Sequence, residues 1–153
     1  MVEMKKGKGF TLVEFMVSLF ILSLLLNIAY TSFNIGIDSY VRTIDNLEIQ
    51  GNMRFAASFI HNLLLNSELD DITIGRDIYG RRTLLIDRTR FHVRNKILMV
   101  EHKYGAGSPS PLADYITGFE VNNDEGLISV VMTGNKGNGT EPISITIKVY
   151  FDE

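Results

Sequence analysis

Apolar residues are distributed unevenly along this chain of 153 residues. Residues 15–37 form an uninterrupted run without a single charged side chain. As an α-helix this run is about 35 Å long, which is enough to cross a hydrocarbon core of roughly 30 Å. The pattern therefore predicts a membrane-spanning helix near the N-terminus.

Beyond this run, apolar residues recur every three or four positions, as they do on an amphipathic helix. The stripe consists of Ile37, Val41, Ile44, Leu47, Ile49, Met53, Ala56, Ile60 and Leu63. It shifts phase beside Gly51, a weak helical position. Acids at residues 68–71 are unfavourable at the negative end of a helix dipole. We therefore expect one long helix over residues 11–66, bent at Gly36, at Gly51 or at both.

The C-terminal half of the chain has the pattern of short strands separated by turns. Strands are expected at residues 82–87, 90–94, 97–102, 115–121 and 127–132. Residues 104–113, rich in glycine and proline, are expected to form a loop. Residues 143–151 alternate apolar and polar side chains and give the clearest strand. The fold class expected is α+β, with the amphipathic half of the helix packed on an antiparallel β-sheet.

Three lysines, Lys5, Lys6 and Lys8, precede the apolar run. A secretory signal peptide has this form, but residues 27–31 lack the pair of small residues that signal peptidase requires. A plain membrane anchor is a second interpretation, with the N-terminus in the cytoplasm by the positive-inside rule. Neither explains Glu14, because an acid within a spanning helix costs about 2.5–3.5 kcal/mol.

Cleavage between Gly9 and Phe10 would give Glu14 a partner. Phe10 would then carry a new α-ammonium group, one helical turn from Glu14. Glu14 could neutralise this group in its own chain or in a neighbouring subunit, which would convert a charge in lipid into half of an ion pair. In this interpretation Glu14 has a role in the assembly of subunits.

The stretch Gly9-Phe10-Thr11-Leu12-Val13-Glu14 resembles the cleavage and methylation motif of type IV prepilins. The resemblance implies that prepilin peptidase cuts after Gly9 on the cytoplasmic side and N-methylates Phe10. It also implies that Glu14 pairs with the N-terminal amine of an adjacent subunit, and that the fold is pilin-like. Residues 1–9 would be the leader, 10–37 the transmembrane and filament-core segment, and 38–153 an extracytoplasmic domain.

The helix segment Gly51-Asn52-Met53-Arg54-Phe55-Ala56 resembles minor pilins and minor pseudopilins. The W-type minor pilins, the J-type minor pseudopilins of type II secretion and the minor subunits of competence pili share these features. Where the first two carry an Asp and an Arg, this chain has Asn62-Leu63-Leu64-Leu65. The resemblance implies a non-enzymatic subunit that helps to initiate or cap a filament. Its partners would be other pilins or pseudopilins and an inner-membrane assembly platform.

Charge suggests an alternative function. The chain has a net charge of −3, yet residues 76–103 carry a net charge of +5. Arg88, Arg90 and Arg94 would share one face of a continuous strand, where they could contact nucleic-acid phosphates. The ordinary alternation of buried and solvent-facing residues along a strand explains the spacing of these arginines equally well. The alternative is therefore a DNA- or surface-binding subunit of a competence or adhesive pilus.

Residues suited to catalysis or metal binding are sparse. The chain lacks cysteine, and His61, His92 and His102 are too scattered to suggest a zinc site, so they are expected at surface or half-buried positions. The turn at residues 122–126, with Asp114, offers oxygen ligands for calcium, but it is more simply a hairpin turn. No phosphate loop or nucleophile motif is present. We expect no catalytic residues, metal or cofactor.

Overall fold

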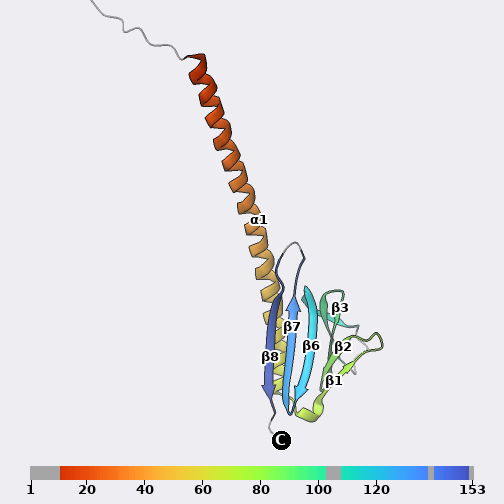
Figure 1. Cartoon of the computed structure of the whole chain (residues 1–153). Helices are drawn as coiled ribbons and strands as arrows, with labels where there is room; N and C mark the ends of the chain where they lie inside the picture. The colour runs from red at the N-terminus through yellow and green to blue at the C-terminus, as the bar shows by residue number, and fades with distance from the viewer. Residues whose placement is uncertain (1–10, 103–107, 138–139, 152–153) are drawn as a thin grey trace, which may run out of the picture. The chain divides into compact units, whose positions relative to one another are not determined.

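The structure is a computed structural model that describes residues 11–102, 108–137 and 140–151. The chain divides into two compact units, Met1–Val41 and Arg42–Glu153. Of the first unit, the described part belongs almost entirely to helix α1 (Leu12–Leu65), whose C-terminal part lies in the second unit. Figure 1 shows this helix and the strands that follow it.

Helix α1 confirms the predicted long helix to within one residue at each end. It is assigned without a break through Gly36 and Gly51. At its C-terminus the amide of Ser67 donates to the carbonyl of Leu64 at 3.3 Å, and the Ser67 hydroxyl donates to the Leu63 carbonyl at 2.8 Å. These bonds satisfy carbonyl groups that the last helical turn would otherwise leave unpaired. A short 3₁₀ helix, η1 (Leu69–Asp71), follows.

The strands of the second unit form two antiparallel sheets, whereas the sequence led us to expect one. The first sheet has the strand order β1-β2-β3-β4-β5 and the second β6-β7-β8. The strands are β1 (Ile72–Arg76), β2 (Arg82–Ile86), β3 (Thr89–Arg94), β4 (Ile97–His102), β5 (Ser110–Asp114), β6 (Ile116–Asp124), β7 (Leu127–Gly134) and β8 (Ile143–Tyr150). The α+β class with antiparallel strands is confirmed.

Two strands differ from the sequence-based expectation, and both lie at the edges of the first sheet. Strand β1 was not predicted, and β5 lies where a loop was expected. Strand β5 contains Pro111, which lacks an amide hydrogen and is therefore tolerated in an edge strand. Its pairing with β4 shifts register between Leu98 and Met99. Both strands are thus defined by the neighbour that they pair with, more than by their own pattern.

The hydrophobic core joins α1 to both sheets in one cluster. Five residues of the helix are fully buried: Ile49, Met53, Ala56, Ile60 and Leu64. Their spacing of four, three, four and four places them on one helical face. The buried stripe is shorter than predicted. It begins at Ile49, because Ile37, Val41, Ile44 and Leu47 are exposed, and Leu63 is only partly buried.

Two contacts show how closely α1 approaches the strands. The Phe59 ring meets the Phe91 ring of β3 edge to face, with the centroids 6.1 Å apart. At the end of β7, Gly134 faces the helix directly: a Cβ atom there would lie 2.6 Å from Met53 Sδ and 2.7 Å from Ile49 Cγ2. The backbone of β7 can therefore reach the helix only because residue 134 has no side chain.

We predict that Gly134→Ala destabilises the domain by about 1–3 kcal/mol, because the added methyl group would overpack the core. Gly51→Ala is the matched control, since Gly51 is exposed on the helix with open space around it. That change should stabilise the helix by roughly 0.5–1 kcal/mol. Thermal unfolding of the full chain in mild detergent, followed by circular dichroism, measures both. Equal stability of the two variants would contradict the close approach at Gly134.

Candidate functional site

Glu14 closes a capping box at the N-terminus of α1. Its Oε2 accepts hydrogen bonds from the Thr11 amide at 2.9 Å and from the Thr11 hydroxyl at 3.0 Å. The Glu14 amide donates to Thr11 Oγ1 at 3.3 Å in return. Thr11 is thus the N-cap residue and Glu14 the third residue of the helix, the reciprocal arrangement that satisfies otherwise unpaired amides. This role was missed from the sequence, although the Thr-x-x-Glu spacing signals it.

The capping box leaves part of the Glu14 carboxylate available. Both bonds from Thr11 go to Oε2, and Oε1 accepts none within the described part of the chain. Gly9 and Phe10, the predicted cleavage and methylation positions, lie outside the described residues. A carboxylate can accept from several donors at once. Glu14 can therefore cap its own helix and still receive a cation at Oε1.

The segment after Glu14 suits a hydrocarbon environment. Helix α1 is long and apolar enough to cross a membrane. None of its most apolar segment is buried against other parts of the chain. Three hydroxyl groups in this segment donate to carbonyls of the preceding helical turn: Ser18 to Glu14 at 2.7 Å, Ser23 to Phe20 at 2.7 Å and Thr31 to Asn27 at 2.9 Å. Satisfying these donors inside the helix lowers the cost of placing them in lipid.

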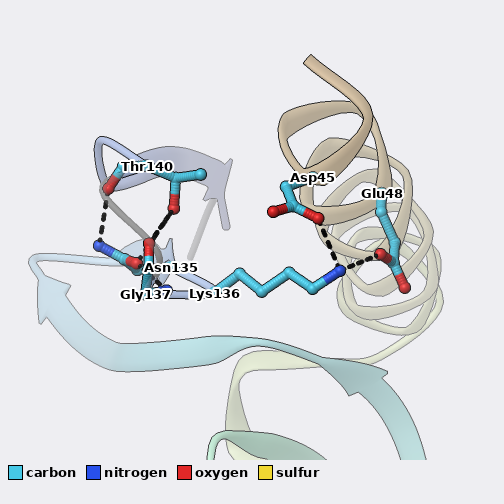
Figure 2. Close-up of polar contacts among 6 residues, drawn as sticks. All are labelled: Asp45, Glu48, Asn135, Lys136, Gly137 and Thr140. Atoms are coloured by element: carbon cyan, nitrogen blue, oxygen red, sulfur yellow. Dashed lines mark hydrogen bonds and ion pairs between the residues drawn. The ribbon is translucent and has the colours of Figure 1, made fainter. Parts of the chain in front are cut away.

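A second polar site joins the loop between β7 and β8 to α1 (Figure 2). Lys136 Nζ lies 2.8 Å from Asp45 Oδ1 and 2.8 Å from Glu48 Oε2. It also lies 5.0 Å from the centre of the Tyr115 ring, within reach of a cation–π interaction. The hydrogen bonds that Lys136 donates to Asp45 and Glu48 raise the pKa of Lys136 well above its usual range. Lys136 therefore stays charged at physiological pH and fastens the loop to the helix.

The loop that carries Lys136 is braced by Asn135 (Figure 2). The Asn135 side-chain oxygen accepts from the Gly137 amide at 2.6 Å and from the Thr140 hydroxyl at 3.3 Å. Its Nδ2 donates to the Thr140 carbonyl at 3.3 Å. This local network fixes the backbone on both sides of Lys136. Neither Asn135 nor Lys136 was singled out from the sequence.

The three arginines considered for nucleic-acid contact do not share one strand. Arg88 lies in the turn before β3, 3.9 Å from Asp87. Arg90 lies in β3, 3.6 Å from Glu101 of β4, and Arg94 is the last residue of β3. Carboxylates beside two of the three thus offset part of the positive charge of this region.

His92 differs from the expected surface or half-buried position, because it is only 6% exposed in β3. Burial is the main effect that lowers its pKa, and the nearby Arg81 charge lowers it further. Glu101 and Asp77 oppose this shift, and Arg90 adds a smaller lowering effect. Arg81 is itself held by Asp77, which accepts from its Nε at 2.5 Å. His92 is therefore a buried neutral imidazole that resists protonation.

The other residues considered for metal binding do not converge. Among the described residues there is no group of three or more His, Asp or Glu side chains that could hold a metal ion. In the β6–β7 turn, the Asn123 side chain accepts from the Gly126 amide at 3.2 Å, and Glu125 and Gly126 both have positive φ. This geometry is that of a two-residue hairpin turn. His102 Nδ1 lies 3.2 Å from Thr89 Oγ1.

We predict that Asp45→Asn weakens the fold more than Glu48→Gln. The Asp45 side chain is 9% exposed and the Glu48 side chain 45%, although both lie equally close to Lys136. Losing a charged hydrogen bond at a buried position should cost roughly 1–3 kcal/mol, whereas an exposed pair contributes about 0.2–1 kcal/mol. Thermal unfolding of the two isosteric variants measures the difference. The reverse ranking would show that burial of Asp45 does not govern this contact.

We also predict that the free energy of unfolding falls as the pH drops below about 6.5, the ordinary pKa of histidine. The unfolded chain binds a proton at His92 in this range while the folded chain does not, so acidification favours unfolding. His92→Gln should flatten this dependence. His61→Gln on α1 is the control and should preserve it. Denaturant titrations between pH 5 and 7.5 supply the measurement, and an unchanged slope in His92→Gln would contradict the assignment.

Comparison with known protein families gives a match near the N-terminus. Residues 4–30 match the family model described as the prokaryotic N-terminal methylation motif. No curated protein and no solved structure matches the chain. The matched residues include the Gly9–Phe10 junction, the capping box and the first part of the charge-free run. The motif supports a type IV pilin-like or pseudopilin-like subunit, and the long apolar helix that follows it fits a membrane anchor.

Proposed function

We propose that this protein is a minor pilin or minor pseudopilin, a structural subunit that helps to initiate or cap a filament. The observation that carries the proposal is the methylation motif at residues 4–30, which leads directly into the Thr11–Glu14 capping box and the charge-free helix. This combination favours a membrane-anchored structural subunit over an enzyme. The filament is that of a type IV pilus, a type II secretion pseudopilus or a competence pilus.

Processing is the first step of the proposed function. Prepilin peptidase cuts the peptide bond between Gly9 and Phe10 on the cytoplasmic side, and the new amine of Phe10 is methylated. Thr11 and Glu14 both remain in the mature chain, so the cut preserves the capping box. The processed helix stays in the cytoplasmic membrane through residues 10–37, and residues 38–153 lie outside the membrane.

Assembly is the second step, and it uses the two oxygens of Glu14 differently. Oε2 caps the subunit's own helix through Thr11. Oε1 receives the N-terminal amine of an adjacent subunit as the protein leaves the membrane. An unpaired charge in hydrocarbon is costly, so this pairing favours the subunit interface over the isolated subunit in lipid. A complex with other minor subunits would form the first turn of the filament on the assembly platform.

The minor role draws on the second unit and on the helix sequence. Residues 51–56 resemble the corresponding segment of minor pilins and pseudopilins. They include Met53 and Ala56, which are fully buried under the sheets, while Phe55 is 60% exposed. This face of the helix is therefore free to contact a neighbouring subunit while the opposite face holds the domain together.

We predict that Glu14→Gln leaves the protein membrane-bound and processed but lowers its incorporation into filaments by roughly tenfold, the effect of about 1.4 kcal/mol of contact energy. Glutamine can still close the capping box, so this variant removes only the charge. Thr11→Val is the matched control: it removes the cap hydroxyl, keeps the charge and should incorporate nearly normally. Immunoblots of sheared filaments and membranes measure incorporation.

Gly9→Val supplies the reference for an unprocessed chain, because we expect a branched side chain before the junction to block the cut. Normal incorporation of Glu14→Gln would contradict the proposed ion pair. Loss of incorporation in Thr11→Val alone would assign Glu14 to helix capping and remove its role in assembly.

A further inference from the structure

The charge-free run contains two asparagines, Asn27 and Asn34, whose side chains differ from those of Ser23 and Thr31. The hydroxyls of Ser23 and Thr31 donate to carbonyls of their own helix. The side-chain amides of Asn27 and Asn34 form no hydrogen bond within the described part of the chain. Each amide has two N–H donors and a carbonyl acceptor. In hydrocarbon, where no water is available, these groups need partners from another molecule.

The two asparagines lie on one face of the helix. They are seven residues apart, which is close to two helical turns and about 10 Å along the axis. Thr31 lies between them on the same side. A shallow depression of about 280 Å³ adjoins this face, lined by Leu24, Asn27, Ile28, Thr31 and Ser32. Small hydroxyl side chains beside an amide allow two helix backbones to approach closely.

Depth distinguishes Asn27 from Asn34. In the run 15–37, Asn27 lies about 18 Å from the first residue and about 15 Å from the last, near the centre of a hydrocarbon core of roughly 30 Å. Asn34 lies only about 5 Å from the end of the run, where interfacial water can reach its amide. Asn27 therefore has the stronger need for a protein partner.

We propose that Asn27 is the centre of a contact through which two copies of this chain pair side by side in the membrane, before assembly. The proposal rests on the membrane insertion stated under the proposed function. A carboxamide is self-complementary, because its N–H donors fit the carbonyl of a second carboxamide. Two copies inserted with the same orientation place Asn27 opposite Asn27 at the same depth.

The seven-residue spacing supports this choice of partner. In a parallel pair with twofold symmetry, equivalent residues meet across the axis. A repeat of seven keeps one face of each helix directed at the other, so Asn34 also meets its own copy. An unrelated helix would need polar groups at the depths of both Asn27 and Asn34. A second copy of this chain carries asparagines at the same two depths. Buried asparagines in this arrangement set the register of the pair.

Cysteine cross-linking tests the proposal, because the chain contains no cysteine and each variant of the full chain would carry one thiol. Ser23→Cys and Thr31→Cys place the thiol on the Asn27 face and leave both asparagines in place. Leu22→Cys and Ala29→Cys place it on the opposite face as matched controls. Mild oxidation of native membranes should give a disulfide-linked homodimer with the first two variants and little with the controls.

Adding Asn27→Leu to Thr31→Cys should lower the cross-linked fraction by about three- to tenfold, and adding Asn34→Leu should have a smaller effect. Equal cross-linking on both faces, an unchanged fraction with Asn27→Leu, or adducts only with a different protein would overturn the proposal.

Alkaline carbonate extraction keeps this test separate from the proposed function. Protein that stays in the membrane pellet but forms no homodimer would refute the pairing alone. Protein released by carbonate would refute the membrane anchor, and the pairing with it.

Discussion

The second unit, Arg42–Glu153, depends on one packing interaction, the burial of a single face of α1 beneath both sheets. Each sheet is apolar on one face and needs a cover, and the helix stripe from Ile49 to Leu64 provides it. Gly134 allows β7 to approach the helix, and the Lys136–Asp45 bond fastens the adjacent loop. The strand pairings fix the shape of each sheet, and this shared core joins the two sheets and the helix into one unit.

The two parts of helix α1 differ in their surroundings: the N-terminal part is apolar and exposed, and the C-terminal part has one face buried in the core. In its N-terminal part the polar requirement is met locally, by a capping box and by hydroxyls that donate to the preceding turn. In its C-terminal part the apolar requirement is met by distant strands. Among the described residues, the Glu14 carboxylate is only partly satisfied, and the Asn27 side-chain amide forms no hydrogen bond. In our interpretation both complete their hydrogen bonding through other subunits, which relates the chemistry of the helix to assembly.

Local patterns predicted the features that are encoded locally. The charge-free run and the three- to four-residue period predicted α1, and alternation predicted β8. Edge strands β1 and β5 were missed, because Gly75 and Pro111 weaken their patterns and pairing with a neighbour defines them. The contact between Lys136 and Asp45 joins residues 91 positions apart, and His92 owes its burial to packing. Neither leaves a signal in the nearby sequence. Glu14 was recognised for its charge, while its capping partner Thr11 was overlooked.

The most direct test of the filament role is mass spectrometry of the tagged protein, purified in mild detergent from its own membranes. We predict an N-terminal peptide that begins at methylated Phe10, together with small prepilin-like proteins that co-purify. The identities of these proteins would also distinguish secretion from competence or adhesion. Recovery of the protein alone, with residues 1–9 still attached, would contradict both the processing at Gly9 and the role of Glu14 in assembly.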